Sequence, residues 1–194
     1  WSAADIVGVT VRSALLAQYS VDINSADKNG DTALHWAVRG KRDSLISLLL
    51  SPPVGADVHA QSARGRTPLF LASMFGLGAP SIVRLIEARS DVTATDQDGA
   101  TVLHKIVAYT GKGTFDAYGS ETAAIAAAKC YLHHGASSCL FVPDKDCRTP
   151  GVLACLRGLS RLKDFYEDAE SSHLLAWLAA LMMFIPVRDV ANII

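Results

Sequence analysis

A turn-and-helix segment recurs four times along this chain of 194 residues. The copies read DKNGDTALHWA from Asp27, ARGRTPLFLA from Ala63, DQDGATVLHKI from Asp96 and DKDCRTPGVLA from Asp144. Equivalent turn positions fall at 30, 65, 99 and 147, so they are separated by 35, 34 and 48 residues. A repeat with this period predicts a stack of small units, each of which packs mainly on its two neighbours.

Each copy predicts a tight turn that leads into a helix. Glycine at the turn accepts a positive φ angle without strain. Threonine is expected to cap the helix start, and proline suits the first helical position because its missing N–H would have no partner there. A second apolar helix follows each first one, with Leu and Ile at residues 45–50 and 82–86. The segment before Asp27 is interpreted as the end of an earlier, incomplete repeat.

The pattern D-x-x-G-x-T-P-L-H-x-A, followed by a leucine-rich second helix and by Gly-Ala-Asp-Val at residues 55–58, resembles the ankyrin repeat. The resemblance covers roughly residues 15 to 160. It implies an all-α solenoid of two antiparallel helices per repeat, with short hairpin loops and a concave face that binds partner proteins. It also implies that His35 and His104, at one repeat position, join the turn to the helix start by hydrogen bonding.

Four residues depart from that pattern. Phe70 replaces the histidine of the second copy, and Arg89 stands where glycine normally ends the second helix. In the fourth copy Cys147 replaces the turn glycine and Gly151 replaces the leucine. The fourth copy is therefore degenerate, as is common for a terminal repeat, which has a neighbour on one side only.

The third copy is about fifteen residues longer than the repeat period. The extra residues fall at 110–121, between its two helices, and predict an exposed glycine-rich loop. Gly111-Lys112-Gly113-Thr114 within it differs from a phosphate-binding loop, because the earlier glycine and the preceding strand are missing. We therefore expect no nucleotide site there.

The C-terminal end is strongly apolar. Residues 152–169 are expected to be helical, Ser171-Ser172-His173 to break the pattern, and an apolar helix to run from Leu174 to Val187. About fourteen helical residues span about 21 Å, which is less than the roughly 30 Å of a hydrocarbon core. The predicted organisation is thus ankyrin repeats over 1–170, beginning with a partial repeat over 1–26 and continuing with repeats near 27, 62, 96 and 144. Residues 171–194 then form a C-terminal cap, or a helix that docks on a partner or a membrane surface.

Composition limits the partner class. Half of the residues are hydrophobic, 19% are charged and the net charge is −1, so the chain as a whole has no electrostatic affinity for nucleic acid. Its four cysteines form no C-x-x-C pair, which favours reduced thiols in an intracellular compartment. Residues 1–11 show no signal peptide, and the absence of an initial methionine before Trp1 indicates a fragment or a processed chain.

Little in the chain predicts catalysis. Zinc is commonly bound by the residue types found at Cys130, His133, His134 and Cys139, but no closely spaced pair of ligands anchors a metal site there. No serine, cysteine or carboxylate stands in the sequence context of an activated nucleophile or of an acid–base pair. We therefore expect no enzyme activity, no cofactor, no metal and no small-molecule substrate.

The leading hypothesis is a non-catalytic protein-binding module or scaffold. The alternatives are a permanent subunit of a larger, membrane-associated assembly, docked through the insertion and the apolar tail, and a regulatory region of a longer enzyme. Candidate contact residues are those at variable turn positions, at the ends of the inner helices and in the tail: Lys28, Asn29, Asp31, Arg64, Arg66, Gln97, Asp98, Ala100, Arg39, Met74, Phe75, Ala108, Tyr109 and Trp177. Met74, Phe75 and Tyr109 are the most prominent, because large apolar groups often anchor interfaces.

Overall fold

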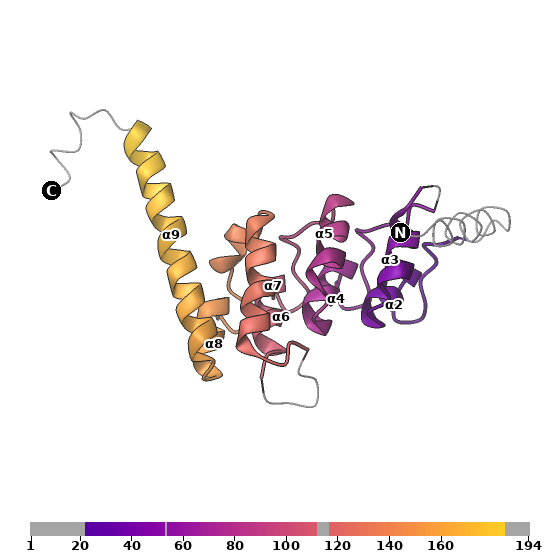
Figure 1. Cartoon of the computed structure of the whole chain (residues 1–194), viewed down its shortest axis with the longest axis horizontal. Helices are drawn as coiled ribbons and strands as arrows, with labels where there is room; N and C mark the ends of the chain where they lie inside the picture. Colours follow the sequence, from indigo (N-terminus) through magenta and orange to yellow (C-terminus); the bar gives the residue numbers. More distant parts are fainter. Residues whose placement is uncertain (1–21, 53, 112–116, 185–194) are drawn as a thin grey trace.

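A computed structural model describes residues 22–52, 54–111 and 117–184 of the chain, with side chains as far as residue 176. Within these ranges the chain is helical and contains no strand. Helical hairpins follow one another along the long axis of the molecule (Figure 1). The elements are α2 (Ala33–Arg39), α3 (Asp43–Leu50), α4 (Pro68–Phe75), α5 (Ala79–Glu87), α6 (Val102–Ala108), α7 (Glu121–His133), the 3-10 helix η1 (Ala136–Leu140), α8 (Pro150–Leu156) and α9 (Ser160–Phe184).

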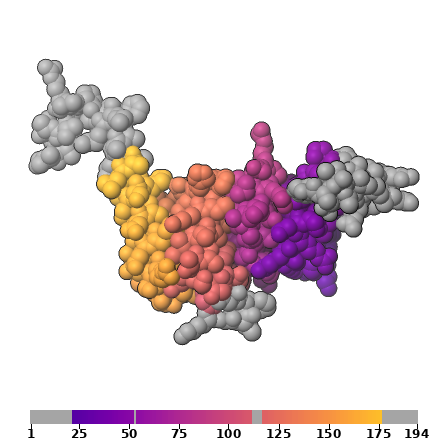
Figure 2. Space-filling view, in the orientation of Figure 1, coloured from indigo at the N-terminus to yellow at the C-terminus, as the bar shows by residue number. Residues whose placement is uncertain are grey.

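The helices form two layers. The first helices of the hairpins, α2, α4, α6 and α8, contact one another in chain order and make an inner layer. The second helices, α3, α5 and α7, make an outer layer in the same way, and α9 contacts both α7 and α8. Neighbouring hairpins are in continuous contact from residue 22 to α9 (Figure 2). The predicted all-α solenoid is confirmed.

The core is built from the same position of successive repeats. Leu34, Leu69 and Leu103 are all fully buried between the layers. In the fourth copy this position is Gly151, where an added β-carbon would lie only 3.1 Å from a carboxylate oxygen of Glu170 in α9. The buried Tyr166 of α9 also lies close to this point, so α9 passes near the backbone at Gly151.

Threonine caps the inner helices as predicted. The Thr67 hydroxyl accepts a hydrogen bond from Phe70 N–H at 3.2 Å, and Pro68 occupies the first turn of α4. The Thr149 hydroxyl accepts from Val152 N–H at 3.4 Å at the start of α8. These caps satisfy N–H groups that have no partner within the helix.

The predicted break at Ser171–His173 is wrong. One continuous helix, α9, runs through these residues, and its C-terminal end extends beyond the other helices (Figure 1). Serine and histidine lower helix propensity only slightly, and their exposed positions require no packing that would oppose the helix. The boundary expected at residue 171 is therefore the middle of a 25-residue helix.

The expected exposed loop at 110–121 is also only partly correct. Thr110 is fully buried, and its hydroxyl donates to the Ile106 carbonyl at 2.6 Å. The Tyr118 hydroxyl donates to the Ser73 carbonyl in α4 at 2.6 Å. A β-carbon at Gly76 would collide with the backbone of the returning loop. The two ends of the insertion are therefore packed against the solenoid, while residues 112–116, including most of the Gly-Lys-Gly-Thr motif, lie outside the described residues.

Candidate protein-binding surface

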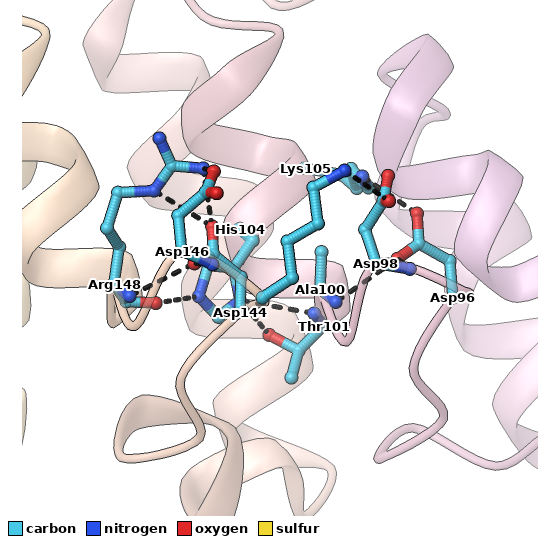
Figure 3. Close-up of polar contacts among 10 residues, drawn as sticks. Asp96, Asp98, Ala100, Thr101, His104, Lys105, Asp144, Asp146 and Arg148 are labelled. Atoms are coloured by element: carbon cyan, nitrogen blue, oxygen red, sulfur yellow. Dashed lines mark hydrogen bonds and ion pairs between the residues drawn. The ribbon is translucent and has the colours of Figure 1, made fainter.

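Three of the four hairpin turns are held by an aspartate at their first position, and the second has Ser62 there. In Asp27, Asp96 and Asp144 one carboxylate oxygen accepts two backbone N–H groups of its own turn, at 2.8 to 3.1 Å. Figure 3 shows this arrangement in the third and fourth copies. Backbone hydrogen bonds of 2.8 to 3.2 Å also join each turn to the next, as from Ala63 N–H to the Asn29 carbonyl. The turns are therefore fixed in register with one another.

The two repeat histidines have the structural role that the resemblance implies. The Thr32 N–H donates to His35 Nδ1 at 3.1 Å, and His35 Nε2–H donates to the Arg66 carbonyl of the next turn at 2.9 Å. His104 makes the same pair of bonds, with Thr101 at 3.1 Å and with the Arg148 carbonyl at 2.7 Å (Figure 3). This geometry requires a neutral ring that carries its proton on Nε2, and burial lowers the pKa of His104, which favours that form.

The second carboxylate oxygen of each turn aspartate reaches the inner-layer surface. Asp27 accepts from the indole N–H of Trp36 at 3.2 Å, whereas Asp96 pairs with the ammonium of Lys105 at 2.8 Å. Trp36 and Lys105 occupy the same repeat position, directly after the histidine. One position of the inner helix is thus tied to the turn but differs in chemistry from repeat to repeat. In the fourth copy the second oxygen of Asp144 pairs with the guanidinium of its own turn's Arg148.

Trp36 is the large exposed aromatic of the first complete repeat, with 51% of its surface accessible. The guanidinium of Arg39 lies 4.9 Å from the Trp36 ring and 5.8 Å from the ring of Phe75. The same guanidinium forms an ion pair with Asp31 at 3.1 Å. We call Trp36, Arg39 and Phe75 the aromatic–arginine cluster. It joins α2 to α4 on the surface of the inner layer.

Two pockets lie on either side of Arg39. The first, here called the arginine pocket, has a volume of about 290 Å³ and is lined by Asn29, Asp31, Arg39, Ser62, Ala63, Arg64, Arg66 and Leu71. The second, of about 310 Å³, is lined by Trp36, Ala37, Arg39, Gly40, Arg42 and Leu45. Together with the aromatic–arginine cluster they give the first two complete repeats a surface with both apolar and cationic groups.

Several predicted contact residues lie on exposed parts of the turns. Lys28, Asn29 and Arg64 are exposed. Gln97 is also exposed, although its amide donates to the Ala63 carbonyl at 2.7 Å. Asp98 forms an ion pair with Lys145 at 2.7 Å, and this contact lowers the pKa of Asp98.

Other candidates are less exposed than the sequence predicted, or lie outside the described side chains. Met74, Asp31 and Ala100 are buried, because Met74 belongs to the core and the other two close their turns. Arg66 is largely enclosed, and Arg39, Phe75, Ala108 and Tyr109 are half-buried. The side chain of Trp177 lies outside the described residues.

Sequence reasoning missed Trp36. The repeat position gives only a weak signal, because the equivalent residue of the second copy, Leu71, is buried in the core.

Metal binding, thiol reactivity and membrane crossing find little support in the described residues. The His134 ring is bonded to the Cys130 carbonyl at 2.7 Å, and no group of three potential metal ligands occurs in the part of the chain that the structure describes. Burial raises the pKa of the Cys139 thiol to about 11, which keeps it protonated. In the same described ranges, no helix combines the length and apolar character that crossing a membrane requires.

Stacked hairpins, Thr–His caps and turn-to-turn hydrogen bonds define a helical-repeat protein whose function depends on its surface. A family model described as "Ankyrin repeats (3 copies)" matches residues 7–96. The structure continues the same hairpin pattern through α8. Residues 7–96 of the chain therefore contain ankyrin repeats.

Relatives with ankyrin repeats differ widely in overall size and in name. The chain is 48% identical to Palmitoyltransferase ZDHHC17 of Danio rerio over 59 residues, which is 30% of the chain and 9% of that protein. It is 34% identical over 102 residues to the Ankyrin repeat domain-containing protein OPG023 of Monkeypox virus, covering 47% of the chain and 15% of the relative. It is also 34% identical over 89 residues to Neurogenic locus notch homolog protein 1 of Xenopus tropicalis, which is 46% of the chain and 3% of that relative. The chain thus spans less than a sixth of each of these relatives.

Proposed function

We propose that the chain is a non-catalytic protein-binding module whose partner contacts the inner layer and the turns of the first two complete repeats. Ankyrin repeats generally mediate protein–protein interaction, and the aromatic–arginine cluster supports this particular face. Tryptophan and arginine are among the residue types most enriched at the energetic centres of interfaces, and here the guanidinium of Arg39 lies over the ring of the exposed Trp36. The two pockets beside Arg39 provide recesses for side chains of the partner.

Site-specific photo-crosslinking tests this face. A benzoylphenylalanine at position 36 or 75 is expected to crosslink the same partner in cells of the source organism. The matched controls are positions 44 and 87, which are exposed on the outer helices α3 and α5. Equal crosslinking from the inner and outer positions, or crosslinks to unrelated proteins, would contradict the proposed surface.

Substitution provides a quantitative version of the same test. Trp36→Ala combined with Phe75→Ala is expected to weaken capture of the crosslinked partner by about tenfold or more. Ser44→Ala is the control. Helical circular dichroism should be retained, because Trp36 and Phe75 are both partly exposed.

A second candidate function is permanent docking into a larger assembly through α9. Leu174 and Leu175 of α9 are 51% and 66% exposed. Such neighbouring exposed leucines are typical of a contact surface. Analytical ultracentrifugation of the chain with Leu174→Ser and Leu175→Ser distinguishes the two ideas. Loss of an assembly in this variant, with the inner face intact, favours docking through α9.

A third candidate is a recruiting or regulatory region of a longer enzyme. One named relative is a palmitoyltransferase, of which the matched segment is 9%. The complete reading frame around the chain tests this directly, since a frame that encodes no further domain contradicts it. We also propose an intracellular, reducing location, because the four cysteines are free thiols. Alkylation of Cys147 and Cys155 in intact cells, before lysis, tests that location.

A further inference from the structure

The arginine pocket carries a local excess of positive charge. Three of its lining side chains, Arg39, Arg64 and Arg66, are cationic, against the single carboxylate of Asp31. The net charge of the whole chain is −1, so the excess belongs to this site and does not reflect the composition. The fully buried Leu71 also lines the pocket, so these charges border an apolar surface.

The charges of this pocket are not all neutralised within the protein. Asp31 is already paired with Arg39 at 3.1 Å. Arg66 Nε lies 3.9 Å from Asp96, whose nearer cation is Lys105 at 2.8 Å.

Two guanidinium groups remain available. Arg66 Nε is buried and has no hydrogen-bond partner among the described residues. Arg64 is exposed, and its guanidinium forms no ion pair with any residue that the structure describes. A buried donor without an acceptor is unfavourable, so an incoming acceptor is favoured there.

We infer that the arginine pocket binds a carboxylate side chain in an acidic segment of the partner. Guanidinium groups bind carboxylates through paired, charge-assisted hydrogen bonds. A volume of about 290 Å³ admits a side chain but no folded element. Trp36 stands on the other side of Arg39 and offers an apolar contact to the residue beside the acid. This inference rests on the proposed function and adds the chemical class of the segment that is recognised.

A titration with one defined probe tests the inference. N-acetyl-glutamate N-methylamide carries a single carboxylate, and N-acetyl-glutamine N-methylamide is its neutral match. The glutamate probe is expected to shift the Nε–Hε resonances of Arg64 and Arg66 in a saturable way, and more weakly at high salt. Arg64→Gln should weaken binding about fivefold. Arg89→Gln, an exposed arginine at the end of α5, should leave binding unchanged.

Each outcome bears on the inference. Equal binding of the neutral probe, or shifts that do not saturate, would overturn it. Tighter saturable binding of phenyl phosphate would also overturn it and assign the pocket to phosphorylated segments. The crosslinks from position 36 do not depend on Arg64. If they persist while the titration fails, only the carboxylate inference is lost; if they fail while the titration succeeds, the proposed function is lost.

Discussion

Replacing Cys147 with glycine should stabilise the protein, because this residue holds a backbone conformation that suits glycine. Its φ angle is 58°, close to the 73°, 70° and 71° of the glycines at equivalent positions 30, 65 and 99. A left-handed conformation costs a residue with a β-carbon about 1–2 kcal/mol. Glycine removes this cost, but it also raises the entropy of the unfolded chain, which reduces the gain in stability by about 0.4–1 kcal/mol. The net gain in the free energy of unfolding is therefore about 0.5–1 kcal/mol.

Urea unfolding followed by circular dichroism measures this gain, which corresponds to a midpoint shift of about 0.4 M. Cys147→Ala is the matched control, since it removes the thiol but keeps the strained angle. If Cys147→Ala and Cys147→Gly stabilise the protein equally, the conformational reasoning is refuted.

Glycine positions that have different surroundings give a second check on the same reasoning. A β-carbon at Gly99 meets nothing nearer than 3.7 Å, so Gly99→Ala should cost only the conformational term. A β-carbon at Gly30 would lie 2.7 Å from the Ala63 nitrogen, so Gly30→Ala should cost more. Equal costs at these two positions would show that the close approach of adjacent turns is unimportant.

Three further predictions concern stability. Burial lowers the pKa of His104 below its ordinary value of 6.5. The contribution of His104 to the free energy of unfolding is therefore complete above pH 6.5 and is lost as the pH falls toward the lowered value. His104→Phe should flatten the pH dependence of the urea midpoint. Tyr118→Phe removes the hydrogen bond to Ser73 and should cost about 1 kcal/mol by urea unfolding. Met74→Ala should lower the free energy of unfolding by about 2–5 kcal/mol, and by more than the half-buried Phe75→Ala does.

The repeat pattern predicted the scaffold well because its key residues act locally. Thr67 and His104 make their bonds within their own turn or to the adjacent turn, so a short motif contains the information. Even the departures at Arg89 and Cys147 keep the positive φ angle of the residue they replace. The local geometry is therefore preserved where the residue type is not.

The prediction failed where distant segments meet. Nothing in the motif indicated that Tyr118 would reach Ser73, 45 residues earlier, and so draw the returning insertion against α4. The break expected in α9 failed for a different reason: Ser171 and Ser172 are exposed and weaken a helix only slightly, so α9 continues through them. Met74 was misplaced because a residue near a helix end is buried or exposed according to its neighbours.

Trp36 shows how the repeated scaffold and the surface are connected. Its indole N–H is bound by Asp27, the same residue that closes the turn, and its ring is covered on one side by Arg39. The ring is therefore held in one orientation before any partner arrives, which reduces the conformational entropy lost on binding. At the equivalent position of the third copy, Lys105 is held by Asp96 in the same way. In these two repeats the turn aspartate fixes the residue after the histidine, an indole in one and an ammonium group in the other, so the same backbone presents different chemistry at one position.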